Sequence, residues 1–383
     1  MNRTLGRNTA FITLVALLAL AAPGAGTANA AGKPKAAPIA AKIGVISILT
    51  GQGAGYGEAI TNGFKLARDE INAKGDVKID LVIEDSSGKQ EQALAAAQKL
   101  INSYNVAAIL GPTLSTEMKV VGPEANASGV PIMGTSTTAA GITQIGKYVF
   151  RNSLPESLAI PASIKSAVRK YKIRKVALLY GNDDVFTKSG FDTMKKVSED
   201  LGLKILTIQE FQKGQADYKA QLTTIKSLSP DAIFCSALYE EGAVILSQAR
   251  KMGITVPFVG GNGFNSPKIA EIAGPAADGV ISGSPWFVGK DDARSKAFVA
   301  AFRAAYGHDP DQFAAQAYDT LFILAAAFDR AGGTQGAGLR DALLKTDSTG
   351  LLGPFRFTAD RDPASVEGVV VTVIKGGKFV PLN

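Results

Sequence analysis

Hydroxyl-bearing side chains gather at two predicted strand-to-helix junctions, GPTLST over 111–116 and GTSTT over 134–138. Ser115 falls where a helix should begin, so its hydroxyl is expected to cap that helix beside free backbone N–H groups. A helix N-terminus also carries partial positive charge, which suits a carboxylate. Either cluster alone could be ordinary capping. Open α/β sheets bind ligands at the carboxyl ends of their strands, so the two clusters together indicate a site for a small acid.

A glycine-rich segment, GQGAGYG over 51–57, follows another predicted strand, and the pair Glu84-Asp85 ends the next strand. A dinucleotide-binding fold arranges its glycines and its ribose-binding acid in this way. The G-x-G-x-x-G pattern fails here in every frame, because the last position is Tyr56, Glu58 or Ile60. We therefore expect no nicotinamide cofactor. The segment is interpreted as a turn that lets the backbone come close to something in a cleft.

Catalysis and metal binding have few candidate residues. The chain holds one His and one Cys, which excludes an intrachain disulfide and a Cys/His zinc site. A Ser-His-Asp triad would need His308, which lies in the turn-forming sequence YGHDP and is expected to be exposed. The basic run KSAVRKYKIRK over 165–175 has Tyr171 as its one aromatic residue. It is typical of a solvated helix end rather than a nucleic-acid site. We expect no enzyme, no metal, no cofactor and no nucleic-acid partner.

The N-terminal sequence predicts export. Arg3 and Arg7 precede an apolar run over 10–22 and a small-x-small cleavage site, so residues 1–30 are interpreted as a signal peptide that is removed. The run is shorter than the roughly 20 residues that a spanning helix needs. No cysteine follows the cleavage site, so no lipid anchor is expected. Residues 31–41 are expected to form a flexible Pro/Ala/Lys tail.

The rest of the chain has the composition of a folded protein. Its 383 residues are 46% hydrophobic and 20% charged, which is too apolar for a disordered chain. The length favours two domains over one.

Strands and helices alternate from Lys42 onward. In the first half, strands are predicted over 42–49, 78–85, 106–111 and 130–133, and helices over about 60–74, over 90–104 and from about Ser115. After 151–153 the pattern restarts, with strands over 175–180, 204–209, 232–235, 257–259 and 279–287. The helices predicted among them are marked by Ile164/Val168/Tyr171, Phe191/Met194/Leu201 and Ile245/Ala249/Met252. Two helices over 291–306 and 311–331 and a strand-like tail over 355–382 follow. This alternation predicts an α/β fold with two doubly wound parallel-sheet lobes that share a cleft.

The order of several motifs resembles that of the periplasmic leucine/isoleucine/valine-binding proteins of ABC importers. The motifs are KIGVISIL at 42–49, TG-x-x-A-x-YG at 50–57, IN-x-x-G at 71–75, ED at 84–85, GP at 111–112 with Ser115, PI at 131–132 with STT at 136–138, FR at 150–151, DAI at 231–233, QAR-x-x-G at 248–253 and AYD at 317–319. They run in order through nearly all of residues 42–383, so the resemblance is more specific than any single motif.

The resemblance implies a type I periplasmic binding protein, with two lobes joined by three crossovers around a ligand cleft. The crossovers would lie near 151–155, 284–287 and 364–368. One lobe would hold residues 42–155 and 285–365, and the other would hold residues 156–284 and 366–383. The implied location is the periplasm.

The resemblance also implies which residues bind the ligand. The family's carboxylate and ammonium contacts fall on Ser115, Ser136 and Thr138, with Leu114 and Thr137 beside them, and its cleft aromatic falls on Tyr56. Aromatic contacts from the second lobe fall on Phe186 and on Leu238 or Tyr239. The family's acid for the ligand ammonium falls on Asn262.

Asn262 departs from the family pattern. An amide can accept a hydrogen bond but supplies no charge. Either a nearby acid takes its place, with Glu240, Glu241, Asp183 and Asp184 as candidates, or the ligand has no amine.

The expected function is that of an exported, monomeric solute receptor. It would capture a small amphipathic acid by hinge closure and deliver it to an ABC permease and its ATPase. The leading ligand is a branched-chain or hydrophobic amino acid, and the alternative is an aromatic or aliphatic carboxylic acid without the amine. A function of another class, a ligand-sensing module for a signalling partner, would use the same fold.

Overall fold

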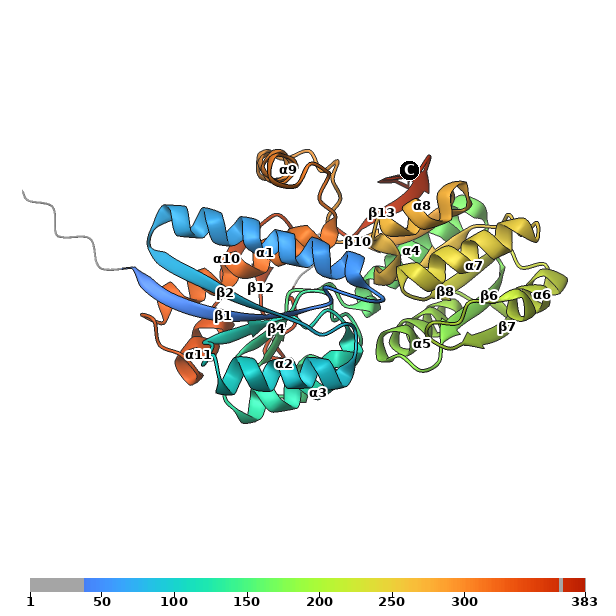
Figure 1. Ribbon diagram of the computed structural model, residues 1–383. Coiled ribbons are helices and arrows are strands. Elements are labelled where there is room, and N and C mark those ends of the chain that lie inside the picture. The colour runs from blue at the N-terminus through green and yellow to red at the C-terminus, as the bar shows by residue number, and fades with distance from the viewer. Residues whose placement is uncertain (1–37, 365–367, 383) are drawn as a thin grey trace, which may run out of the picture. The chain divides into compact units, whose positions relative to one another are not determined.

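The computed structural model describes residues 38–364 and 368–382 (Figure 1). The predicted signal peptide, residues 31–37 of the predicted tail and the middle of the third predicted crossover lie outside these residues. Strand β1 begins at Ile39 and pairs with β2 from its first residue. The end of the predicted tail is therefore part of a sheet. Within the described residues, no helix combines the length and hydropathy that crossing a membrane requires.

The first sheet has the strand order β2-β1-β3-β4-β5, and all of its strands are parallel. The strands are β1 (Ile39–Ser47), β2 (Val77–Asp85), β3 (Ala108–Leu110), β4 (Ile132–Gly134) and β5 (Val149–Arg151). The elements between them are α1 (Ala54–Lys74), α2 (Gln90–Asn102), α3 (Ser115–Ala127) and the short 3-10 turn η1 (Thr143–Ile145).

Both faces of this sheet are covered by helices. Ile43 and Val45 on β1 pack into one core with α1 and α10 (Gln312–Arg330), whereas Ile46 packs into a second core with α2 and α3. Figure 1 shows the two pairs of helices on opposite sides of the strands. A strand buried on both faces reads as a continuous apolar run, which explains the sequence of β1.

The second sheet has the strand order β14-β13-β10-β9-β8-β6-β7. Its parallel strands are β6 (Lys175–Gly181), β7 (Lys204–Phe211), β8 (Ala232–Ser236), β9 (Phe258–Gly260) and β10 (Val280–Ser284). Two C-terminal strands, β13 (Val370–Lys375) and β14 (Lys378–Pro381), extend the sheet in the antiparallel sense. The second sheet is therefore mixed rather than purely parallel, with its antiparallel strands at one edge.

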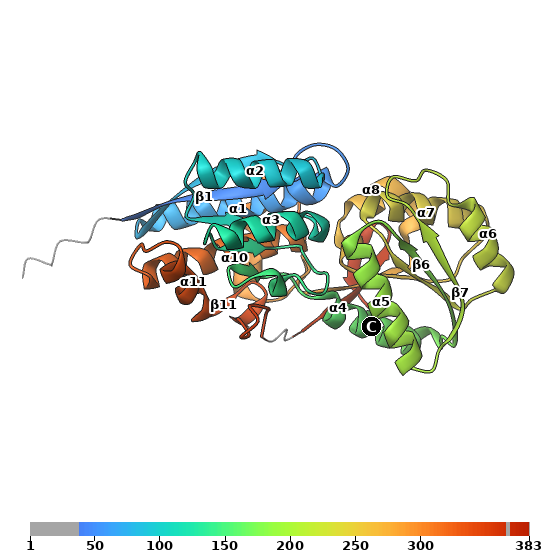
Figure 2. The same cartoon turned by 90° about the horizontal axis from the view of Figure 1, so that it is seen from below.

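Helices cover both faces of the second sheet as well. They are α4 (Glu156–Tyr171), α5 (Val185–Asp200), α6 (Lys219–Leu228), α7 (Tyr239–Lys251) and α8 (Lys268–Ala273), with short turns η2 (Asn262–Asn265) and η3 (Gly274–Ala277). Leu178 on β6 packs in a core with α4 and α5, and Leu179 packs in a core with α6 and α7. Figure 1 and Figure 2 show α5 and α7 on opposite sides of the strands. The lone cysteine, Cys235 on β8, is fully buried in the core beneath α7.

The chain passes between the lobes more than once. It enters the second lobe after β5, and after β10 it returns through α9 (Ala293–Tyr306) to α10, which packs along α1. Helix α11 (Ala337–Leu344) and the hairpin β11 (Asp347–Gly350)–β12 (Gly353–Arg356) follow before the chain joins the second sheet at β13. The predicted α/β fold with two doubly wound lobes is confirmed. Strand β10 ends at Ser284, not at Phe287 as predicted. The strand stops there because the next residue is Pro285, and proline lacks the N–H that a sheet ladder needs.

A close contact between α1 and β1 gives a test of this packing. A Cβ atom at Gly57 would lie 1.7 Å from the carbonyl oxygen of Ile48. Helix propensity alone would make Gly57→Ala stabilising by about 1 kcal/mol. We expect the clash to reverse the sign and to lower the free energy of unfolding by about 1–3 kcal/mol.

Urea denaturation of the wild type and the variant measures the change. Ser227→Ala on exposed α6 is the control, and its effect should stay within about 0.5 kcal/mol. A Gly57→Ala protein as stable as the wild type would show that α1 can move away from β1 without cost.

Candidate functional site

A small cavity lies between the carboxyl ends of the two sheets. Its volume is about 20 Å³, which is room for about one water molecule. Ten residues line it: six predicted ligand contacts, Asn262, which departs from the family pattern, and three others. The lining is Tyr56, Thr113, Leu114, Ser115, Ser136, Phe186, Leu238, Asn262, Gly263 and Phe313.

The remaining predicted contacts do not line this cavity. The hydroxyl of Thr138 donates to Oε1 of Glu156 at 3.2 Å. Thr137 is fully buried beside Gly134, and its carbonyl oxygen accepts from Arg151. Tyr239 packs its ring edge-on against Tyr56, with 4.7 Å between the centroids. Of the two positions that the sequence left open for this contact, Leu238 lines the cavity and Tyr239 lies against Tyr56.

The start of α3 differs from the sequence-based expectation. The N-cap of α3 is Leu114, and Ser115 is its first residue. The Ser115 hydroxyl accepts from the backbone N–H of Ala139 at 3.2 Å, so it ties the helix to the loop after β4 rather than capping the helix. Ser136 on that loop donates to the carbonyl oxygen of Thr113 at 2.5 Å. The two hydroxyl clusters are therefore bonded to each other at the edge of the cavity.

Tyr56 connects the two lobes. Its hydroxyl donates to the carbonyl oxygen of Gly263 at 2.6 Å and accepts from the backbone N–H of Tyr239 at 2.8 Å. On the other side its ring packs against Phe313 at 4.9 Å. Burial raises the pKa of Tyr56 well above its usual value, with the charge of Glu240 adding to the effect. The phenol therefore stays neutral and acts through hydrogen bonds.

The glycine-rich turn approaches the second lobe. The N–H of Gly53 donates to Glu240 at 2.6 Å, and the N–H of Gly55 donates to the Tyr239 hydroxyl at 3.1 Å. Gln52 donates its side-chain amide to Glu241 at 2.5 Å. What the turn approaches is thus the first turn of α7, which agrees with its interpretation as a place of close backbone approach.

Comparison with known proteins identifies the family of this chain. A family model described as periplasmic binding protein matches residues 40–378. A crystal structure of the branched-chain amino acid transporter substrate-binding protein LivJ from Streptococcus pneumoniae, in complex with isoleucine, is 31% identical, with a TM-score of 0.83 over 89% of this chain and 97% of that chain. The chain belongs to the periplasmic binding protein family, in its leucine/isoleucine/valine-binding group.

Two further relatives show the range of names in this group. A leucine-, isoleucine-, valine-, threonine- and alanine-binding protein from Pseudomonas aeruginosa is 26% identical over 79% of this chain and 81% of its own length. A solute-binding protein of an ABC transporter from R. palustris, in complex with benzoate, is 25% identical, with a TM-score of 0.82 over 90% of this chain and 95% of that one. Members of the family are substrate-binding proteins of transporters and not enzymes.

The four acids proposed to replace an acid at Asn262 have other partners. Asp184 caps α5 through the N–H groups of Phe186 and Thr187, and it accepts from the Thr116 hydroxyl. Asp183 accepts from the N–H of Lys213. Glu240 and Glu241 bind the glycine-rich turn as described above. None of the four lines the cavity.

The side chain of Asn262 is held by α10. Its Oδ1 accepts from Nε2 of Gln312, and Oε1 of Gln312 accepts from the Ser284 hydroxyl at 2.7 Å and from Nδ2 of Asn265 at 3.0 Å. Ser284 ends β10, where the chain leaves the second lobe. The cavity is therefore linked by hydrogen bonds to that crossover.

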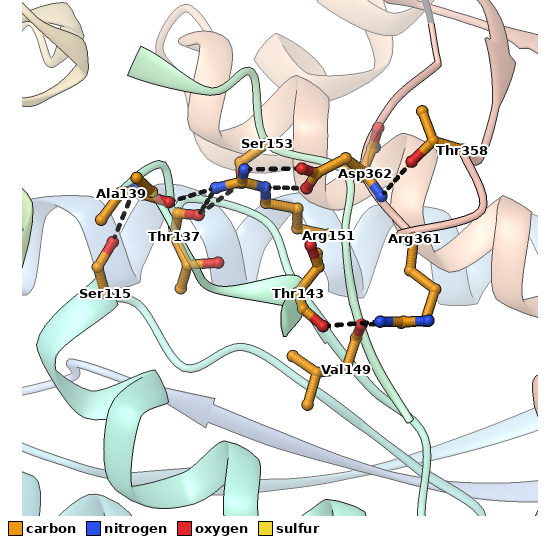
Figure 3. Close-up of polar contacts among 12 residues, drawn as sticks. Ser115, Thr137, Ala139, Thr143, Val149, Arg151, Ser153, Thr358, Arg361 and Asp362 are labelled. Carbon is orange, nitrogen blue, oxygen red and sulfur yellow. Dashed lines mark hydrogen bonds and ion pairs between the residues drawn. The ribbon is translucent and has the colours of Figure 1, made fainter. Parts of the chain in front are cut away.

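Arg151 holds the loop that carries Ser136. Figure 3 shows its guanidinium between this loop and Asp362. Nη1 donates to the carbonyl oxygens of Thr137 at 3.0 Å and Ala139 at 2.7 Å, while Nε and Nη2 donate to the Asp362 carboxylate. The Arg151 side chain is 3% exposed. Its role could not be read from the sequence, because Asp362 is far away along the chain.

Other features noted in the sequence lie away from the cavity. His308 is exposed in the turn after α9, as expected. The six basic residues over 165–175 are exposed on α4, in the turn after it and at Lys175, which begins β6, in agreement with the predicted solvated surface.

The arginine gives a prediction about this loop. Arg151→Lys keeps the charge but cannot reproduce the fork to Asp362 and the two carbonyl oxygens. We expect the free energy of unfolding to fall by about 2–4 kcal/mol, because buried carbonyl oxygens lose their donors. Arg303→Lys, at an exposed pair with Asp309, is the matched control and should change it by less than about 1 kcal/mol.

Chemical denaturation of both variants measures the difference. Equal losses at the two positions would contradict a positioning role for Arg151.

Proposed function

We propose that this chain is a non-enzymatic receptor, exported to the periplasm after removal of its signal peptide, that binds a small amphipathic carboxylic acid. As a monomer it delivers this acid to the permease and ATPase of an ABC importer. The leading ligand is a branched-chain or hydrophobic amino acid.

The composition of the cavity wall carries the proposal. The wall includes the Ser115 and Ser136 hydroxyls and the N-terminus of α3, whose partial positive charge favours a carboxylate. It also includes the apolar side chains of Leu114, Phe186 and Leu238, which favour an apolar tail. This combination of hydroxyl donors and apolar side chains is what an acid with a hydrocarbon side chain requires.

The relatives support the ligand class. The Pseudomonas protein is named for five amino acids, and the Streptococcus structure contains isoleucine. All of these amino acids have a carboxylate, and all except threonine have the apolar side chain for which the cavity wall is suited.

Binding by movement of the lobes follows from the size of the cavity. A volume of about 20 Å³ is too small for an amino acid. The lobes are joined across it by the hydrogen bonds of Tyr56, Gly53 and Gln52. A ligand therefore enters when these contacts open, and contacts to both lobes then favour closure around it.

A second candidate is a carboxylic acid without the amine. Asn262 is the observation in its favour, because a neutral amide gives no counter-charge to an ammonium, and the R. palustris relative contains benzoate. A sensing module for a signalling partner would use the same cavity, and no observation on this chain favours it.

A thermal-shift screen of the purified protein tests the proposal. A ligand at a hundredfold excess over its Kd stabilises the folded state by about 2.7 kcal/mol, which should raise Tm by at least ~2 °C. Small acids with apolar tails should give this shift, and sugars, nucleotides and metal ions should not. Stabilisation by a sugar but by no acid would overturn the proposal.

Ser115 gives the sharper test of the carboxylate end. If its hydroxyl donates to the ligand carboxylate, Ser115→Ala removes a hydrogen bond to a charged group, and such a bond contributes about 1.5–3 kcal/mol. We expect affinity to fall roughly 10- to 150-fold. If the hydroxyl only accepts from Ala139, the variant should lose about 1 kcal/mol of stability and keep its affinity.

Calorimetry and chemical denaturation on the same variant separate the two outcomes. Ser198→Ala is the control, because Ser198 is fully buried in α5, away from the cavity, and bonds to the Met194 carbonyl oxygen. It should leave affinity unchanged.

A further inference from the structure

Glu156 is a buried acid directly behind the cavity wall. It is the first residue of α4, at the first crossover between the lobes, and it is 1% exposed. Its Oε1 accepts from the Thr138 hydroxyl at 3.2 Å and from the backbone N–H of Asn262 at 2.9 Å. Its Oε2 is buried and has no hydrogen-bond partner within the described part of the chain.

The positive charge of Arg151 acts on Glu156, but no hydrogen bond joins these two described side chains. The Arg151 guanidinium bonds instead to Asp362 and to two carbonyl oxygens. No ion pair among the described residues includes Glu156. A buried carboxylate with a free oxygen and no counter-ion is costly, so it either takes up a proton or binds a partner that supplies the missing contact.

Gly261 provides the space for this acid. A Cβ atom there would lie 2.7 Å from Oε2 of Glu156 and 3.0 Å from Oε1. The backbone at Gly261, with φ of −95°, is open to any residue, so its glycine is not needed for the turn. Because residue 261 has no side chain, the Glu156 carboxylate can approach residue 262.

We propose that Glu156 is the acid that meets the amine of the ligand, and that the site therefore takes an α-amino acid rather than a simple carboxylic acid. The inference rests on the proposed function. Thr138, from the first lobe, and Asn262, from the second, both bond to Glu156, so an ammonium admitted between these two residues when the lobes open lies beside the Glu156 carboxylate. Glu156 does not line the closed cavity, and the acid that position 262 lacks is supplied from position 156 once the lobes separate.

The protonation of Glu156 supplies an independent signature. Burial raises the pKa of Glu156 to about 7, against the lowering effects of its bonds to Asn262 and Thr138 and of the Arg151 charge. An ammonium beside it lowers that pKa, so binding of an amino acid below pH 7 releases a proton. Amino-acid affinity should therefore rise from pH 5.5 to about 7 and then level off. An acid without the amine favours protonated Glu156, so its affinity should fall over the same range.

The experiment compares leucine with 4-methylpentanoate, which lacks only the amine. Calorimetry on the wild-type protein at pH 7.5 should show at least a tenfold preference for leucine. In Glu156→Gln the affinity for leucine should fall at least tenfold and the preference should disappear, while 4-methylpentanoate binds as well as before or better. At pH 6, leucine binding to the wild type should release a proton, measured from two buffers of different ionisation enthalpy, and binding to the variant should not.

Two more variants keep the test decisive. Gly261→Ala leaves Glu156 in the sequence but forces its carboxylate away, so it should also reduce the preference for leucine, even if Glu156→Gln fails to fold. Asp319→Asn removes a different buried acid, whose pKa is raised to about 6 by burial and which bonds to the N–H groups of Leu351 and Leu352. It should leave the preference intact.

The outcomes separate the two proposals. If the folded wild type binds neither compound nor any other small acid, the proposed function fails. If the wild type binds both compounds equally, or if Glu156→Gln and Gly261→Ala keep the preference for leucine, the role of Glu156 is overturned and the receptor function stands.

Discussion

The buried guanidinium of Arg151 is the contact on which the candidate site depends. Taking a cation out of water is stabilising only if its donors are satisfied, and here they are satisfied by segments far apart in the sequence. The carbonyl oxygens of Thr137 and Ala139 fix the loop that carries Ser136 and Thr138, and Asp362 anchors the segment that follows β12. One side chain thus couples the site loop to the connections between the lobes.

The same segment is held a second time by Arg361. Its guanidinium donates to the carbonyl oxygens of Val149, the first residue of β5, and of Thr143, the first residue of η1 (Figure 3). Residues 152–155 join β5 to Glu156, so these bonds help to position the start of α4. The position of the buried acid relative to Asn262 is therefore determined by contacts outside the cavity, which fits a site built on rigid elements and not on free loops.

Much of the fold could be predicted from the sequence, because the signal is local. Apolar runs and helical spacing placed most of the strands and helices within a few residues. The missed elements include α8 and α11, and several others have weak signals: α6 buries only Leu222 and Ile225, β5 has three residues, and β11 has the polar sequence DSTG. These segments take their structure from neighbours distant in sequence, which no local pattern records.

The site was less predictable, for the same reason. The residues that line the cavity follow from the family resemblance, but the role of Ser115 as a cap was wrong, because its hydroxyl bonds to Ala139 on another loop. Glu156 reads in the sequence as an ordinary acid in the first turn of a helix. Its proximity to Asn262, 106 positions later, exists only in the folded chain.

The burial of Cys235 has a practical consequence for watching the lobes move. Burial in the core of the second lobe raises the pKa of its thiol far above the usual range, so the thiolate that reacts with maleimides is scarce and inaccessible. Because the chain contains no other cysteine, thiols introduced on the exposed surface of each lobe would take fluorophores selectively. The native Cys235 would therefore stay unlabelled, so a fluorescence sensor built from two introduced thiols would report only the distance between the lobes.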